Sequence, residues 1–208
     1  MNTREKVSEL ARTFAGLSYA PATRDAYLEL LAPAKLDDPA TRDACGHAWS
    51  CYLTTLGLWR RLGVEHPDLA IRYVSGAAPA WVAAIAASRG AERVPDGVSM
   101  PSLGDAIEVN GGEHIIAAIV SIVLEGAVAT VDTIEGGQVD ASGNKSISLF
   151  TGKRMRYVGR ALMLGGGIVV RWFDASTLGV PDDVAPDTER PAAGATDPGE
   201  PAAGGGGA

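Results

Sequence analysis

The first ninety residues carry their apolar side chains at helical spacing. From Val7 to Phe14 the apolar positions share one face of a helix that we expect from about Arg4 to Ala15, with Thr3 as its N-cap. The clearest of the predicted helices stops at Gly63, because glycine favours helix ends. After the first helix, the pattern predicts three more, over Arg24–Leu31, Cys51–Leu62 and Ala78–Arg89.

After Pro101 the pattern changes to short runs that are mostly rich in valine, isoleucine and other apolar residues. Glycine-bearing turns separate several of these runs, which is typical of antiparallel strands. The predicted strands are Ala106–Val109, His114–Leu124, Val128–Thr133, Ser146–Phe150, Met155–Leu164 and Ile168–Phe173. Helices that precede a meandering sheet predict an α+β fold, with N-terminal helices packed on an antiparallel β-sheet.

Composition divides the chain at about Gly179. We expect residues 1–178 to form one domain, because the length and a hydrophobic fraction of 46% allow a proper core. Residues 179–208 are mainly Pro, Gly, Ala and acidic residues, with too few large apolar side chains to offset the entropy cost of ordering. We therefore expect a disordered acidic tail, whose six acids and one arginine carry −5 of the total charge of −7.

Charge and hydropathy exclude several classes of partner. Without the tail the chain is close to neutral, so it lacks the basic surface that nucleic acids and anionic membranes attract. No run of about 18 to 20 apolar residues predicts a membrane span. Residues Met1 to Leu17 carry charges of both signs and no apolar segment, so we expect no secretory signal and synthesis in the cytoplasm.

Cys51 is the main candidate for a nucleophile. A thiol attacks as its thiolate, and both a helix N-terminus and a nearby imidazole lower the thiol pKa. Cys51 begins the clearest predicted helix, so the partial positive charge of that helix end is aimed at its sulfur. The free N–H groups of the first helical turn would also bind an oxyanion.

The base has to come from another part of the chain. Of the three histidines, His66 lies in a polar turn and His47 lies four residues before Cys51. His114 begins an apolar strand, and a strand start is a fixed platform that suits a general base. We predict His114 as the base, and His47 stays an alternative.

A third group should hold the imidazole in the right tautomer. A hairpin that turns at Gly126 places residues 132–138 opposite residues 114–120. The polar candidates in that stretch are Asp132, Glu135 and Gln138, of which Glu135 is favoured.

These residues lie in segments that resemble cysteine peptidases of the papain-like superfamily. Ser50–Leu53, followed by Trp59–Val64, resembles the nucleophile helix of NlpC-like cell-wall peptidases. Pro101–Ala106, followed by Glu113–Ile115, looks like the strand pair that carries the histidine in the same superfamily. Thr133–Gly137 is similar to the Glu-Gly-Asn stretch of the related CHAP amidases. The chain departs from these motifs, with Ser50 for the usual Asp before the cysteine and Gly137 for the usual Asn.

The resemblance covers about Asp43 to Gly137, in the order Cys, His, acid. It implies a papain-like fold and an enzyme that cleaves amide bonds of peptidoglycan stem peptides through Cys51, His114 and Glu135. Such an enzyme needs no cofactor and no metal, and we expect a monomer. Without a signal or a wall-binding repeat, we expect delivery to the cell wall as a phage lysis enzyme or as an effector, with a secretion apparatus or an inhibitor as partner.

Other interpretations compete with this one. Cys51 would be an ordinary buried cysteine if the chain is a non-catalytic binding module, since cysteine is among the most buried residues. Cys45, His47 and Cys51 form an incomplete set of zinc ligands, and Cys45 is a rival nucleophile. Glu135 would be a turn residue beside two glycines. A cysteine hydrolase that acts on another small amide is a further alternative.

Overall fold

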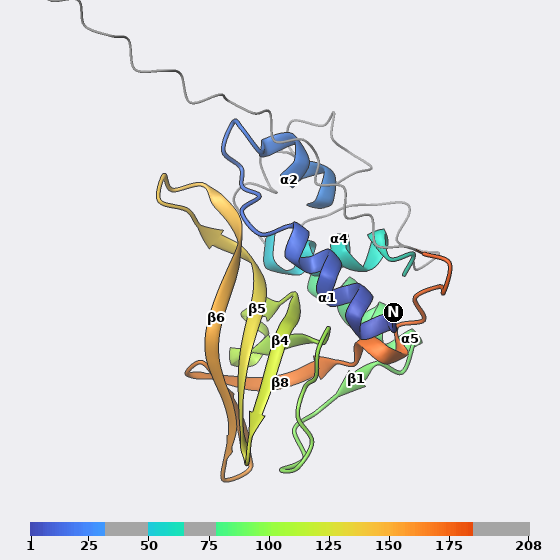
Figure 1. Cartoon of the computed structure of the whole chain (residues 1–208), viewed down its shortest axis with the longest axis vertical. Coiled ribbons are helices and arrows are strands. Elements are labelled where there is room, and N and C mark those ends of the chain that lie inside the picture. The colour runs from blue at the N-terminus through green and yellow to red at the C-terminus, as the bar shows by residue number, and fades with distance from the viewer. Residues whose placement is uncertain (32–49, 65–77, 185–208) are drawn as a thin grey trace, which may run out of the picture.

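The computed structural model describes residues 1–31, 50–64 and 78–184 (Figure 1). Cys45, His47 and His66 lie outside the described residues, and so does most of the predicted tail. In the described part, helices from the first half of the chain pack on an antiparallel sheet from the second half, so the predicted α+β plan is confirmed.

The described helices follow the predicted ones closely. They are α1 (Thr3–Thr13), α2 (Arg24–Leu31), α4 (Ser50–Arg61) and α5 (Ala78–Ser88). The predicted cap of α1 is wrong, because Asn2 caps the helix and Thr3 is its first residue. Asn2 Oδ1 accepts a hydrogen bond from Glu5 N at 3.0 Å, and Asn2 N donates to Glu5 Oε2 at 2.8 Å. This reciprocal capping box satisfies two N–H groups at the helix start and therefore fixes where α1 begins.

The strands form one eight-stranded antiparallel sheet in the order β3-β2-β8-β7-β6-β5-β4, with β1 paired to β8. Their bounds are β1 (Glu92–Arg93), β2 (Ala106–Val109), β3 (His114–Ile116), β4 (Ala118–Glu125), β5 (Val128–Val139), β6 (Lys145–Val158), β7 (Ala161–Leu164) and β8 (Gly167–Phe173). Because neighbours in sequence are mostly neighbours in the sheet, short turns join most of the strands.

The bounds of four predicted strands are wrong. The run from His114 to Leu124 is broken at Ala117, whose N–H leaves the β2 ladder and donates to Ile134 O at 2.9 Å. The runs predicted over 146–150 and 155–164 are divided differently, because β6 continues through Gly152 and the turn to β7 follows Val158. β5 also continues six residues beyond its predicted end at Thr133. β1 was not predicted, since two polar residues carry no strand pattern.

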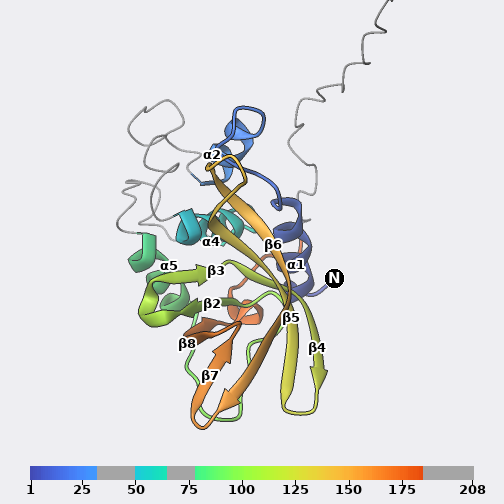
Figure 2. The same cartoon turned by 90° about the vertical axis from the view of Figure 1, so that its left-hand side faces the viewer.

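The sheet curls until its two ends meet, which divides the interior into two cores. Gly104 N donates to Ile119 O at 2.8 Å and Ile119 N donates to Asp105 O at 3.0 Å, so the start of β4 lies beside the chain that enters β2. One core fills the curl of the sheet and includes Ile107, Val131, Met155 and Trp172. The larger core lies between the helices and the sheet and includes Leu10, Leu53, Leu58 and Trp59. The helices cover only the upper part of the sheet, and the lower halves of β5 and β6 extend beyond them (Figures 1 and 2).

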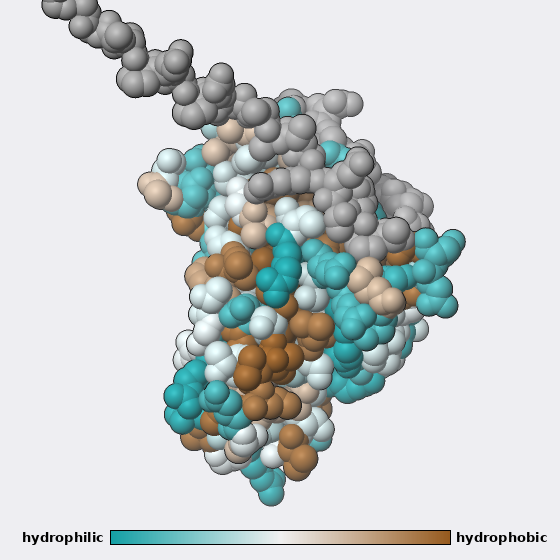
Figure 3. Space-filling model, in the orientation of Figure 1, coloured by the Kyte–Doolittle hydropathy of each residue, from teal (hydrophilic) through white to brown (hydrophobic). Residues whose placement is uncertain are grey.

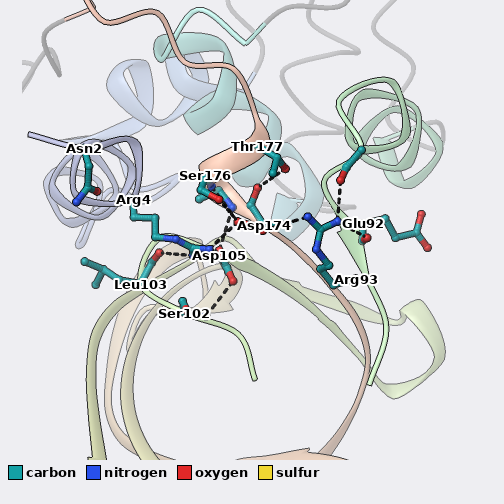
Figure 4. A network of polar contacts seen from close by, with 12 residues as sticks. Asn2, Arg4, Glu92, Arg93, Ser102, Leu103, Asp105, Asp174, Ser176 and Thr177 are labelled. Carbon is teal, nitrogen blue, oxygen red and sulfur yellow. Dashed lines mark hydrogen bonds and ion pairs between the residues drawn. The ribbon is translucent and has the colours of Figure 1, made fainter. Parts of the chain in front are cut away.

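A buried carboxylate joins α1 to the sheet. Asp105, which is 1% exposed, accepts hydrogen bonds from Arg4 Nη1 at 2.5 Å, Ser102 N at 2.8 Å and Ala175 N at 2.9 Å (Figure 4). Arg4 also donates to Asp174 Oδ1 at 2.6 Å. Burial raises the pKa of Asp105 to about 6, although these donors lower it. Asp105 therefore fixes the entry of the chain into β2.

The body continues past the predicted boundary at residue 178. Val180 is 8% exposed, and Lys6 Nζ donates to Pro181 O at 3.0 Å and to Asp182 O at 2.8 Å. The first residues assigned to the tail therefore pack against α1, because Val180 supplies an apolar side chain to bury. None of the described helices combines the length and the apolar character that a membrane crossing needs.

Candidate active site

Cys51 lies in the first turn of α4, at the junction of the helices and the sheet. The described part of this helix begins at Ser50, and its residues from Ser50 to Trp59 are all buried. Cys51 is 8% exposed and is a free thiol. The sulfur is thus held by packing on most sides, in the helical position that the sequence predicts.

His114 begins β3 and reaches the Cys51 thiol. The turn before it, Asn110–Gly112 (η4), has positive φ at all three residues, with 55° at Asn110 and 88° at Gly112. A Cβ at Gly112 would lie 2.7 Å from Glu108 Oε1, so the chain needs glycine there to turn back into β3. The ring of His114 forms a hydrogen bond with the Cys51 side chain, and its own side chain is 26% exposed.

Glu135 completes the set on the other side of the imidazole. Its Oε2 lies 3.1 Å from His114 Nε2, and its side chain is 4% exposed. The register Ala118↔Ile134 confirms the predicted hairpin and brings Glu135 beside the start of β3. Because Nε2 faces the carboxylate, Nδ1 is the ring nitrogen left for the thiol. The structure therefore brings together all three predicted residues.

Two further side chains hold Glu135. Thr133 Oγ1 donates to Glu135 Oε1 at 2.6 Å, and Lys153 Nζ on β6 forms an ion pair with the same oxygen. The sequence did not identify Lys153, because the predicted strands broke the chain between 150 and 155. The tight turn at Asp140–Asn144 could have identified it. This turn sets the pairing of β6 with β5, and that pairing places Lys153 on the strand beside β5.

A bulge in β5 seats the start of α4. Gly136 and Gly137 stand opposite a single residue of β6, because the register passes from Glu135↔Ser148 to Gln138↔Ser146. A Cβ at Gly136 would lie 2.0 Å from Thr54 Oγ1 and 2.7 Å from Ser50 O. At Gly137, where φ is 78°, a Cβ would lie 3.3 Å from the Cys51 nitrogen. The two glycines after Glu135 therefore allow the strand to pass close under the nucleophile.

The electrostatics of the pair favour a charged thiolate and a charged imidazolium. Burial raises the pKa of Cys51, but the hydrogen bond and charge of His114 and the backbone N–H groups of Ile115 and Tyr52 bring the pKa below the ordinary thiol value. Burial lowers the pKa of His114, yet its bonds to Cys51 and Glu135 raise that pKa to about 9. The lowered thiol pKa and the raised imidazole pKa both favour transfer of the proton from the sulfur to the ring.

Glu135 stays ionised in this environment. Burial raises its pKa, but hydrogen bonds from His114, Lys153 and Thr133 outweigh burial and lower the pKa to about 2. A carboxylate that is charged at neutral pH stabilises the imidazolium and fixes its orientation.

Tyr52 joins the nucleophile helix to the turn before His114. Its hydroxyl lies 2.8 Å from Glu108 Oε1 and 2.9 Å from Gly112 O, so both are acceptors for its proton. Glu108 in turn forms an ion pair with Arg171 Nε on β8. These contacts couple the position of Cys51 to that of the His114 turn. They were not predictable from the sequence, because Glu108 lies within an apolar strand.

The remaining candidates lie elsewhere or outside the described residues. Asp132 accepts from Gly152 N at 2.9 Å, and Gln138 pairs with Ser146, so neither replaces Glu135 at the imidazole. The zinc alternative includes Cys45 and His47, which the structure does not describe. Among the residues 1–31, 50–64 and 78–184, no cluster of three or more His, Cys, Asp or Glu side chains suits a metal ion.

Comparisons with family models, curated proteins and solved structures identify no relative. No family model matches the chain, and neither a curated protein nor a solved structure gives a significant match. The features of the chain that bear on function are therefore the geometry of Cys51, His114 and Glu135 and the motifs around them.

Proposed function

We propose that the protein is a cysteine amidohydrolase with a papain-like arrangement, and that it cleaves amide bonds of peptidoglycan stem peptides. The observation that carries this proposal is the chain of contacts from the Cys51 thiol to His114 and on to Glu135, 3.1 Å from the ring. Acyl transfer to a thiol needs a nucleophile, a base that contacts it and an acid that orients the base. Cys51, His114 and Glu135 supply these three groups.

Acylation starts from the thiolate–imidazolium pair. The Cys51 sulfur attacks the amide carbon, a C–S bond forms, and the carbonyl π electrons move to the oxygen. The first-turn N–H groups of α4 stabilise this oxyanion. When the tetrahedral intermediate collapses, the C–N bond breaks and His114 gives its proton to the leaving amine. The product of this half-reaction is a thioester on Cys51 and a free amine.

Deacylation uses the same residues in reverse. His114, now neutral, takes a proton from water as the water oxygen attacks the thioester carbon. The C–S bond then breaks, a carboxylic acid leaves, and the thiolate–imidazolium pair is restored. Glu135 stays ionised throughout and holds the ring, since its pKa of about 2 lies far below neutral pH.

The substrate class comes from the motifs that surround the site. The segments Ser50–Leu53, Glu113–Ile115 and Thr133–Gly137, which resemble NlpC-like and CHAP enzymes, are the three that meet at the thiol. This agreement supports a cell-wall substrate, with delivery through phage lysis or a secretion apparatus. A binding module would have no need for a thiol pKa lowered by an imidazole.

The test is digestion of purified sacculi by the reduced protein, followed by mass analysis of the products. Wild-type protein should release fragments with new amino groups, and Cys51→Ala should release none. Cys45→Ser is the matched control and should keep the wild-type rate. Fragment release by Cys51→Ala would refute the proposal. No release by the wild-type protein from any sacculus, together with cleavage of another peptide amide, would refute the substrate class alone.

A further inference from the structure

A groove runs along the part of β6 that the helices leave uncovered. It has a volume of about 460 Å³ and is lined by Lys153, Arg154, Arg156, Val158 and Met163, with Gly165 at the β7–β8 turn. Hydrophilic side chains gather over the lower part of β6, apart from the apolar surface over β4 (Figure 3). The groove therefore lies on a charged face of the sheet.

The groove carries an excess of positive charge. No acidic residue is among those that line it, within the described chain. Of the lining cations, Lys153 is already paired with Glu135. Arg154 and Arg156 are exposed, and the described residues offer neither of them an ion-pair partner. An anion that enters the groove would therefore meet two guanidinium groups free to bind it.

The groove adjoins the candidate active site through one side chain. The stem of Lys153 lines the groove, while its ammonium group contacts Glu135, which binds His114. The β7–β8 turn at the other wall leads into Ile168, whose N–H donates to Asn110 Oδ1 in the turn before His114. A ligand in the groove thus lies against the same two elements that hold the imidazole.

We infer that this groove binds an acidic segment of the substrate peptide, on the far side of Glu135 and His114 from the Cys51 thiol. The inference depends on the proposed function and specifies further that the substrate peptide is negatively charged. Arg154 and Arg156 are two residues apart on one face of β6, which separates them by about 7 Å. That spacing suits two carboxylates on an extended peptide. Val158 and Met163 offer apolar surface for the chain between or beside them.

The first experiment compares native sacculi with sacculi whose carboxylates have been converted to amides. The double variant Arg154→Gln/Arg156→Gln should lose roughly tenfold in kcat/KM on native sacculi, because two exposed ion pairs are removed. On amidated sacculi, wild type and variant should be equally slow. The matched control is Arg160→Gln, an exposed arginine in the β6–β7 turn outside the groove, which should keep the wild-type rate.

Alkylation of Cys51 by iodoacetamide checks that the variant keeps an intact site, and its rate should be unchanged. Full activity of the double variant on native sacculi would overturn the inference, and so would an equal loss in Arg160→Gln, which would indicate general electrostatic attraction instead of a groove.

A binding measurement separates the inference from the proposed function. Fluorescence anisotropy with a labelled oligoglutamate peptide needs no turnover and uses the full chain with Cys51→Ala. The peptide should bind this protein at low salt, and Arg154→Gln/Arg156→Gln in the same background should weaken binding roughly tenfold. If sacculi are not digested but the double variant binds the peptide more weakly, the inference about the groove is supported and the proposed reaction is refuted. Equal binding by both proteins would overturn the groove.

Discussion

Glu135 lies between two cations, His114 and Lys153, and this arrangement influences the pKa of His114. Its Oε2 lies 3.1 Å from His114 Nε2. Its Oε1 forms an ion pair with Lys153 and accepts a hydrogen bond from the Thr133 hydroxyl at 2.6 Å. With a side chain only 4% exposed, the carboxylate acts on both neighbours with little screening. Lys153 therefore offsets part of the negative charge that raises the pKa of His114 to about 9.

The pH dependence of kcat/KM should follow this balance. His114 has to be protonated to deliver a proton to the leaving amine, so activity should fall as pH rises through about 9. Glu135→Gln removes the charge that stabilises the imidazolium, so this alkaline limb should move to lower pH and the maximal rate should fall roughly tenfold or more. The measurement is the pH profile of initial rates on sacculi.

Lys153→Met is the opposing variant for the same profile. Without the ammonium group, the whole charge of Glu135 acts on His114, so the alkaline limb should move to higher pH. Limbs that move in the same direction in both variants, or do not move, would contradict the assignment of Glu135 as the group that orients and charges the ring.

At the scale of elements, the β5 bulge and the start of α4 are the pieces that position the nucleophile. The helix, the hairpin register and the three site residues were predictable because each depends on local pattern: apolar spacing, a glycine turn and polar residues at strand ends. The bulge at Gly136 and Gly137 and the ion pair to Lys153 were not, because they depend on how β5 meets β6 and α4 in space.

Replacement of Gly137 by Ala tests the close approach of this bulge. Both Gly137 and Gly143 have left-handed backbone, with φ of 78° and 84°, so alanine at either site should cost about 1 to 2 kcal/mol of stability. Only at Gly137 would the new Cβ meet Ser50 Oγ at 3.1 Å and Cys51 N at 3.3 Å, since a Cβ at Gly143 meets nothing within 4 Å.

We therefore expect Gly137→Ala to slow sacculus digestion about tenfold or more, because a displaced nucleophile loses its attack geometry. Gly143→Ala should digest at the wild-type rate. Chemical denaturation of both variants verifies that their losses of stability are similar. Equal activities would show that the Gly137 contact does not position Cys51.

For the whole molecule, a few long-range contacts hold the helices on the curled sheet. Arg4 in α1 binds both Asp105 before β2 and Asp174 after β8, and Arg93 on β1 reaches Asp174 at 3.2 Å (Figure 4). The sequence predicts the helical half and the sheet half separately. Ion pairs between residues some hundred positions apart have no local sequence pattern, so they could not be predicted. The network therefore appears only once the chain is folded.

Asp105→Ala should lower the free energy of unfolding by about 1 to 2 kcal/mol at pH 7.5, because it removes the acceptor of two backbone N–H groups and one of the acceptors of Arg4. The loss stays modest because burial already opposes the charged form of this carboxyl group. Urea denaturation measures the difference. Glu9→Ala, at an exposed position of α1, is the control and should leave the midpoint unchanged. Equal midpoints for Asp105→Ala and the wild type would show that the network does not stabilise the fold.

The central claim is that Cys51 is a thiolate activated by His114, and the rate at which iodoacetamide alkylates it tests that claim most directly. The measurement uses a Cys45→Ser background, in which Cys51 is the only thiol of the chain, and follows the rate against pH with and without His114→Ala. With His114 present, the rate should rise at lower pH than it does for an ordinary thiol, because the pKa of Cys51 is lowered, and His114→Ala should move the rise to higher pH. A thiol that stays inert, or one that titrates identically in the two proteins, would contradict the account.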